Sequence, residues 1–226
     1  MKKVSLILSA LMTAMILMSC GDVSSNEAGG KDSSANEVTI GSQVWMNKNL
    51  NLDKFRNGDP IPEAKTDEEW ERQGQNKQPA WCYYNNDPSN AEKYGKLYNW
   101  YAVNDSRGLA PTGYHIPNEI DWKILIDYLG GRVEAGKKMK RISGWSKIDD
   151  GTIRDYESGF AGLPGGGRRS DGVFAEIGKY SVWWSSTSTN KGNNAWMYNL
   201  DDDFDDDLDI DEVDKGSGFS IRCLRD

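Results

Sequence analysis

Histidine is nearly absent from this 226-residue chain and cysteine is scarce, with 1 histidine and 3 cysteines. One histidine excludes metal sites built from a histidine pair, and two cysteines alone make a poor metal site. The sequence also lacks the Gly-x-Ser-x-Gly elbow of serine hydrolases. We therefore interpret His115 as a structural side chain with satisfied hydrogen bonds rather than as a catalytic base.

The chain also has fewer positive than negative side chains, and it has no apolar run long enough to span a membrane. The chain carries 27 Lys and Arg residues against 35 Asp and Glu residues, a formal net charge of −8. Acidic chains have little electrostatic attraction for nucleic acid, so we expect no nucleic-acid partner. The run from Val4 to Met18 is apolar but too short to span a bilayer as a stable helix.

That apolar run has the features of an export signal. Two lysines precede it, and a small residue follows it just before Cys20, as in secretory signals. The tetrad Leu17-Met18-Ser19-Cys20 resembles the lipobox of bacterial lipoproteins, which implies lipidation of Cys20 and cleavage before it. An ordinary signal peptide with an incidental cysteine is the alternative. We expect a signal peptide at 1–19, a lipidated cysteine and flexible tether at 20–37, and one globular domain at 38–226.

The expected location follows from Cys20. Its lipid would attach the protein to a membrane of the cell envelope, on the surface or the periplasmic face of the outer membrane. Two cysteines then remain, Cys82 and Cys223, and an even pair in an exported chain predicts one disulfide. Such a bridge would contribute about 4 to 5 kcal/mol by restricting the unfolded chain. Two buried free thiols are the alternative.

Local patterns in residues 38–226 predict an α+β domain with short antiparallel strands and two helices. The turn Gly41-Ser42 between two short alternating runs predicts a hairpin. Thr66 and Glu69 form a capping box, and Asn118 caps a second helix that stops at Gly130. We expect this second helix to bury one face, which contains Ile120, Ile124, Leu125, Tyr128 and Leu129. Strands are expected at 80–84, 180–186, 195–200 and 219–224, and a short helix within 96–103.

The most acidic segment runs from Asp201 to Asp214 and contains nine aspartates and Glu212. Alternate positions are acidic, which predicts strands with one acidic face and a turn within 201–207. A helix-loop-helix calcium loop is disfavoured because Asp206 occupies the position that requires glycine. A solvated acidic edge is the simplest interpretation. The alternative is a looser calcium site, whose candidate ligands are Asp201, Asp203, Asp205, Asp207 and Asp209.

Aromatic and basic side chains provide the candidate ligand-binding residues. Trp183 and Trp184 are adjacent in a predicted strand, so alternation sends them to opposite faces and one is a candidate stacking platform for a sugar. The segment Gly162–Arg169 contains three consecutive glycines but no lysine at P-loop spacing, which argues against a phosphate-binding loop. Arg168 and Arg169 beside these glycines are candidates for binding a carboxylate.

Several ordered sequence blocks resemble the Fibrobacter succinogenes major paralogous domain. They cover nearly all of 38–226 and comprise Val38–Met46, Cys82–Asp87, Tyr94–Trp100, Gly113–Pro117, Ser158–Phe160, Leu163–Gly166, Trp183–Thr187 and Gly218–Cys223. The chain departs from that pattern at its acidic run and at Gly167. Members of this family look like exported, often lipid-anchored proteins. Pro117 and the C-terminal block also resemble C-type-lectin-like folds and the formylglycine-generating enzyme, which implies an irregular α+β domain.

These observations favour a non-catalytic binding or adhesion module on the cell envelope, with a glycan or a surface protein as its partner. One alternative is a structural envelope protein that binds calcium through the Asp-rich hairpin. The remote alternative is an oxidase like the formylglycine-generating enzyme, whose chemistry uses two redox-active cysteines and copper. Our assignment of Cys82 and Cys223 to a structural bridge argues against that enzyme.

Overall fold

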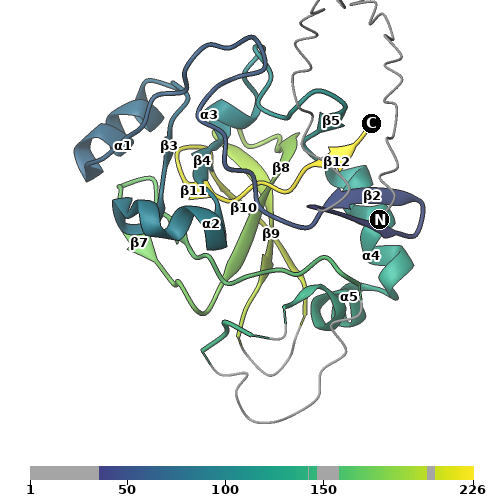
Figure 1. Ribbon diagram of the computed structural model, residues 1–226. Helices are drawn as coiled ribbons and strands as arrows, with labels where there is room; N and C mark the ends of the chain where they lie inside the picture. Colours follow the sequence, from purple (N-terminus) through teal and green to yellow (C-terminus); the bar gives the residue numbers. More distant parts are fainter. Residues whose placement is uncertain (1–35, 142, 147–157, 203–206) are drawn as a thin grey trace, which may run out of the picture. The chain divides into compact units, whose positions relative to one another are not determined.

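The first hairpin and the last strand of the chain lie in the same sheet (Figure 1). The computed structural model describes residues 36–141, 143–146, 158–202 and 207–226, which fall within one unit. The predicted hairpin is confirmed as β1 (Glu37–Ile40) and β2 (Gln43–Met46), with Gly41 in the left-handed region at φ +61°. β2 also pairs with β12 (Leu224–Arg225), which in turn pairs with β5 (Tyr114–His115).

Two further antiparallel sheets complete the described strands. One has the order β10-β9-β8 and consists of β8 (Ser181–Ser188), β9 (Asn194–Leu200) and β10 (Asp209–Asp214). The other has the order β3-β4-β11-β6-β7 and consists of β3 (Trp81–Cys82), β4 (Leu97–Asn99), β11 (Gly218–Phe219), β6 (Gly167–Arg168) and β7 (Phe174–Ala175).

The strand predictions hold for β3, β8 and β9 but not for the C-terminus. The expected strand at 219–224 is wrong, because β11 ends at Phe219 and β12 begins at Leu224. Each of these short strands pairs with a different sheet, so the chain crosses between sheets here. Cys223 therefore lies in the crossing segment rather than within a strand.

The described residues form five α-helices rather than the two expected. They are α1 (Asp67–Gln75), α2 (Ala91–Tyr94), α3 (Trp100–Val103), α4 (Glu119–Leu129) and α5 (Arg132–Met139). The two capped helices are confirmed: both Thr66 and Asn118 form complete capping boxes. α2 and α3 have one turn each, which is too short for an apolar period to be visible in the sequence. The segment 96–103 is half strand and half helix, β4 followed directly by α3.

The buried face of α4 differs from the predicted one. Leu125 and Leu129 are buried as expected, but Ile120, Ile124 and Tyr128 are 65%, 42% and 65% exposed. The remaining buried residues of this helix are Trp122 and Ile126. Relative to the predicted orientation, the helix is rotated about its own axis. The reason is that Trp122 packs against other aromatic rings of the core. The ring of Tyr128 lies over Gly41, where a Cβ would approach Tyr128 Cδ2 to 2.7 Å.

Strand β8 lies between two parts of the hydrophobic core. Trp183 packs in one cluster with Trp122 and Phe160, and Trp184 packs in another with Trp81 and Tyr98. The alternation predicted for this pair is confirmed, but both faces of the strand are covered. A third, smaller cluster surrounds residues of α1 and β3.

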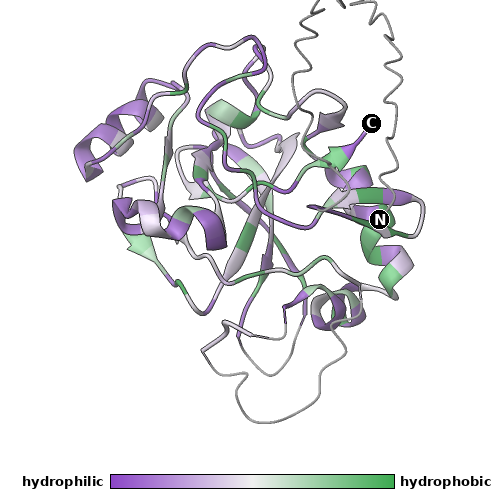
Figure 2. Cartoon of the chain, viewed as in Figure 1, coloured by the Kyte–Doolittle hydropathy of each residue, from purple (hydrophilic) through white to green (hydrophobic). Residues whose placement is uncertain are grey.

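Helix α1 lies at the periphery of the domain and is hydrophilic along most of its length (Figure 2). Trp70 is its one buried residue, and the indole Nε1 donates to Gly216 O at 2.8 Å. None of the helices in the described ranges is long and apolar enough to cross a membrane.

Candidate functional site: a basic hollow beside helix α2

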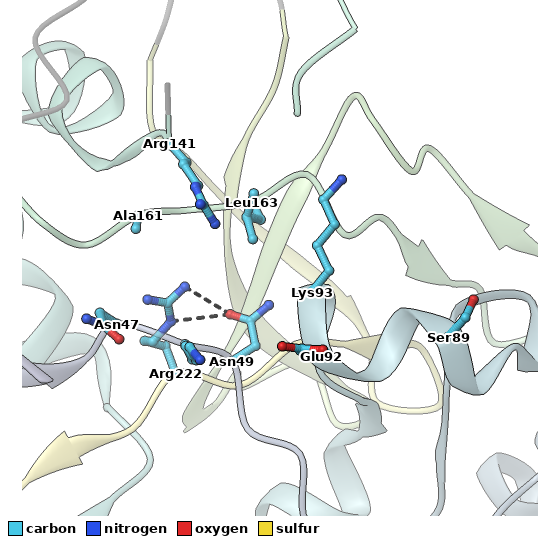
Figure 3. Close-up of a pocket in the computed structure, with 10 residues that line it drawn as sticks. Asn47, Asn49, Ser89, Glu92, Lys93, Arg141, Ala161, Leu163 and Arg222 are labelled. Atoms are coloured by element: carbon cyan, nitrogen blue, oxygen red, sulfur yellow. Dashed lines mark hydrogen bonds between the residues drawn. The ribbon is translucent and has the colours of Figure 1, made fainter. Parts of the chain in front are cut away.

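A hollow of about 670 Å³ opens between α2, the segment that follows β2, and the chain around residues 161–163 (Figure 3). This size is typical of small-molecule binding sites in proteins. Its polar lining includes four cationic side chains and one carboxylate, namely those of Lys48, Lys93, Arg141, Arg222 and Glu92. A basic hollow is unexpected in a chain with a net charge of −8.

Arg222 forms the base of the hollow and is 1% exposed. Its Nε and Nη2 atoms both donate to Asn49 Oδ1, at 3.3 and 3.1 Å. Its Nη1 atom donates to Met46 O at 3.1 Å and also to Phe160 O. All four bonds therefore go to uncharged oxygens, and no carboxylate in the described part of the chain pairs with this cation. Burial lowers the pKa of Arg222, because the charged form has lost its water without gaining an anion.

Aromatic rings complete the environment of Arg222. Its guanidinium carbon lies 4.5 Å from the centroid of the Phe160 ring and 5.8 Å from that of Trp183. Cation–π contacts of this kind stabilise a desolvated cation by about 1 to 2 kcal/mol. The arrangement holds the guanidinium in place but leaves its net charge uncompensated.

Asn49 holds this arrangement together. Besides the two bonds from Arg222, its Oδ1 accepts the indole N–H of Trp183 at 3.0 Å. Its Nδ2 donates to Tyr94 O at the end of α2 and to Ser220 Oγ. One amide thus connects the segment after β2 with α2, β8 and the C-terminal segment. The base of the hollow is consequently a rigid part of the fold.

The three cations at the rim differ from Arg222 in their exposure to solvent. Lys48, Lys93 and Arg141 are exposed. Lys93 lies 4.7 Å from the centroid of the neighbouring Tyr94 ring. Within the described ranges, none of the three forms an ion pair. Figure 3 shows the side chain of Arg141 reaching down toward Asn49 and Arg222.

Two further features mark the lining of the hollow. Asn47 Oδ1 is buried and has no hydrogen-bond partner among the described residues. A buried amide oxygen without a partner costs about 1 to 3 kcal/mol. Ala161 has a φ of +54°, in the left-handed region that disfavours a residue with a Cβ. Unsatisfied polar atoms and backbone strain of this kind concentrate at binding sites.

The structure does not support the sequence-predicted aromatic platform. Trp183 and Trp184 are both 0% exposed, so the prediction that one of them presents its face to a ligand is wrong. Trp184 Nε1 donates to Tyr98 O at 2.8 Å, which ties this indole to the core. Trp183 lies beneath the hollow as a partner of Asn49 and does not line it.

Arg168 and Arg169 each pair with a carboxylate of the chain itself, Asp67 and Asp171, rather than forming a common site for a carboxylate ligand. Arg168 is 0% exposed and donates to Gly172 O, to Ala64 O and to Asp67 Oδ1. Arg169 is exposed and pairs with Asp171 at 2.7 Å. Arg168 therefore joins β6 to the start of α1, and the two arginines do not converge on a common site.

The disulfide prediction is wrong: Cys82 and Cys223 are free, buried thiols. Cys82 packs in the small cluster around α1 and β3, whereas Cys223 packs in the cluster that contains Trp184. Each thiol thus fills a separate part of the core, and an even number of cysteines does not by itself bring two of them together. Burial raises the pKa of both thiols to about 12.

The acidic run is described only in part. Asp203 and Asp205 lie outside the described residues, so the predicted calcium site is not tested at these positions. Asp209 pairs with Arg132 at 3.0 Å and pairs in register with Asn199 of β9. Within the part of the chain that the structure describes, no three acidic, cysteine or histidine side chains form a group suitable for a metal ion. Calcium binding through Asp201, Asp207 and their neighbours stays a prediction.

His115 contacts two carboxylates. Its Nδ1 lies 2.9 Å from Asp226 Oδ1 and its Nε2 lies 3.4 Å from Asp121 Oδ2. These contacts agree with the structural role expected for this histidine. They join β5 to the cap of α4 and to the last residue of the chain.

Sequence reasoning missed the basic hollow. Arg222 falls within the C-terminal block Gly218–Cys223, but no sequence pattern assigns a role to it or to Asn49. The available signal was an arginine between Ile221 and Cys223, since a charge in an apolar segment needs a buried acceptor or a ligand. The rim cations come from three distant segments, so no local pattern joins them.

Comparison with known proteins agrees with the resemblance found in the sequence. The family model of the Fibrobacter succinogenes major domain matches residues 38–225. No curated protein and no solved structure matches the chain. The match therefore identifies the globular part as one family domain, and it carries no statement of activity.

Proposed function

This chain belongs to the Fibrobacter succinogenes major domain family, and we propose that it is a binding module of the cell envelope, attached by a lipid on Cys20. Its partner is a glycan or a protein of the cell surface. The observation that carries the proposal is the basic hollow, in which the buried cation Arg222 has only uncharged hydrogen-bond partners. Such a cation is a preformed site for a negatively charged group.

A non-catalytic role is supported by the state of the reactive side chains. The thiols of Cys82 and Cys223 are buried and have a pKa of about 12, so neither is a thiolate at neutral pH. His115 contacts two carboxylates and lies outside the lining of the hollow. The hollow itself offers cations and amides, which bind and orient a ligand.

The lipid anchor and the likeness to C-type-lectin-like folds belong to this proposal. Support for the anchor comes from the tetrad Leu17-Met18-Ser19-Cys20 and the apolar run before it. Support for the fold likeness comes from the helix entry after Pro117, the block Gly218–Cys223 and the mixed α+β architecture. In proteins generally, binding residues lie disproportionately on loops that a rigid scaffold positions.

Two experiments test the proposal. The lipidated protein, purified in mild detergent, is applied to a glycan array and used as bait against solubilised cell-surface proteins. Saturable binding to any partner supports a binding module, whereas no retention on either panel contradicts it. Mass spectrometry of the N-terminal peptide tests the anchor: we expect Cys20 at the new N-terminus with a diacylglycerol on its thiol and an acylated amine, and an unmodified Cys20 would refute lipidation.

A further inference from the structure

We propose, on the basis of the binding function above, that the hollow binds an acidic glycan and takes one sugar ring that carries an oxyanion. The oxyanion is the carboxylate, sulfate or phosphate group of that sugar. It would lie between Arg141 and Lys93 at the rim, above the buried guanidinium of Arg222.

The first argument is the charge at the base of the hollow. Arg222 is desolvated and receives no negative charge from any described residue. The positive charge of Arg222 would therefore attract a ligand anion in the hollow, because no internal ion pair neutralises it. The four hydrogen bonds of Arg222 go to uncharged oxygens of Asn49, Met46 and Phe160, so its positive charge still attracts an anion in the hollow.

The second argument is the rim. Lys48, Lys93 and Arg141 come from three separate segments but line one hollow. Within the described ranges each lacks an ion-pair partner, so each is available to a ligand. Arg141 is suited to a bidentate contact with a carboxylate, sulfate or phosphate because its guanidinium is planar.

The third argument distinguishes a sugar from a simple anion. Asn47 Oδ1 is a buried acceptor with no hydrogen-bond partner among the described residues, and Glu92 supplies a carboxylate to the same lining. Both groups would repel an inorganic anion, but both accept hydrogen bonds from hydroxyl groups. A ligand that carries hydroxyls beside an oxyanion satisfies the acceptors and the cations together. An acidic sugar has this combination on one ring.

The size of the hollow agrees with this ligand. A volume of about 670 Å³ exceeds what an inorganic anion needs and lies within the range of sites for small organic molecules. Leu163 provides an apolar patch in the lining, against which the carbon face of a sugar ring can pack.

An oligosaccharide array tests the ligand class. It presents sugars that bear glucuronate, galacturonate, sialate, sulfate or phosphate, each beside a counterpart without the oxyanion, to the full-length chain in detergent. We expect at least one acidic sugar to bind at least about tenfold more tightly than its neutral counterpart, as one charge-assisted hydrogen bond provides. The array also shows whether the oxyanion is a carboxylate, a sulfate or a phosphate.

Matched substitutions then locate the site. Lys93→Gln and Arg141→Gln are each expected to weaken binding of the preferred acidic sugar about threefold to tenfold. The controls are Lys123→Gln on α4 and Arg169→Gln after β6, which remove an exposed cation of the same type outside the hollow. Melting curves confirm that all four variants remain folded. Arg222 is left intact because its removal would disturb the core.

The outcomes separate this inference from the binding function itself. Equal affinity for acidic and neutral sugars, or equal effects of the rim and control substitutions, would overturn the acidic-sugar site while leaving a binding module in place. Binding confined to protein partners would do the same. Competition by inorganic phosphate or sulfate without any saccharide binding would also overturn it. Retention of no glycan and no protein would overturn both.

Discussion

Arg222 donates two hydrogen bonds, from Nε and Nη2, to the single oxygen Oδ1 of Asn49, which lies 173 residues earlier in the chain. The same oxygen accepts the indole N–H of Trp183. Three N–H donors on one amide oxygen connect Asn49, near the start of the domain, with Trp183 of β8 and with Arg222 before β12. The base of the hollow therefore forms only when the whole domain is folded.

Asn49→Ala should destabilise the domain by about 3 kcal/mol. The substitution leaves two N–H groups of Arg222 and the indole N–H of Trp183 without their acceptor in a buried environment. Urea unfolding monitored by tryptophan fluorescence measures the free energy of unfolding. Asn190→Ala, at an exposed asparagine, is the matched control and should change stability by less than about 0.5 kcal/mol. Similar small effects for both would show that the Asn49 contacts contribute little.

Arg168→Met and Arg169→Met should differ sharply although the residues are adjacent. Arg168 is fully buried and donates to two backbone oxygens, Gly172 O and Ala64 O, which methionine would leave without a partner. We expect a loss of about 2 to 4 kcal/mol for this variant. Arg169 makes an exposed ion pair with Asp171, so its variant should stay within about 0.5 kcal/mol of the parent. Thermal and urea unfolding decide between these expectations, and equal losses would contradict the structural assignment.

The domain should lose stability in alkaline solution between about pH 9 and pH 12. Cys82 and Cys223 have a folded-state pKa of about 12, raised by burial from 9.0. Between these values the unfolded thiols release protons that the folded thiols retain, so stability falls as pH rises. The loss reaches about 3 kcal/mol per thiol near pH 11, on the basis of 1.36 kcal/mol per pKa unit.

Urea unfolding across this pH range measures the slope, and the variants Cys82→Ala and Cys223→Ala separate the two contributions. Each variant should show a shallower decline than the parent. A parent whose alkaline slope is unchanged by both substitutions would show that the thiols are not the titrating groups. A disulfide between Cys82 and Cys223, seen by mass spectrometry without reductant, would remove the basis of the prediction.

The rotation of α4 is tested by neighbouring alanine substitutions. Leu125 is 0% exposed, so Leu125→Ala should cost about 2 to 5 kcal/mol through lost burial and the cavity that remains. Ile124 is 42% exposed, and Ile124→Ala should cost less than about 1 kcal/mol. Differential scanning calorimetry of the two variants compares them directly. A loss for Ile124→Ala as large as that for Leu125→Ala would favour the helix face predicted from sequence, which contains both residues.

The sequence was informative where structure is determined locally. The capping boxes at Thr66 and Asn118 and the turn at Gly41 depend on residues within four positions of each other, and all three are present. Alternation correctly separated Trp183 from Trp184. It did not show that both faces of β8 are covered, because the covering residues are distant in the chain.

The errors share one physical cause, which is contact between distant segments. Pairing Cys82 with Cys223 required a distance that a cysteine count does not contain. The buried face of α4 differs from the predicted one because Trp122 stacks on Tyr198, with ring centroids 4.3 Å apart. The basic hollow combines residues from 47 to 222 and has no sequence signature apart from a single arginine in an apolar segment.

The central claim is that the hollow above Arg222 and Asn49 is the binding site. A ¹⁵N–¹H correlation NMR titration of the protein with an acidic oligosaccharide tests this claim. The signals to follow are the Arg222 Nε–H and the Trp183 indole N–H, which both donate to Asn49 Oδ1. We predict saturable shifts of both signals, with the Trp70 indole, which is bonded to Gly216 O, unchanged. Unchanged Arg222 and Trp183 signals, or shifts confined to Trp70, would contradict the claim.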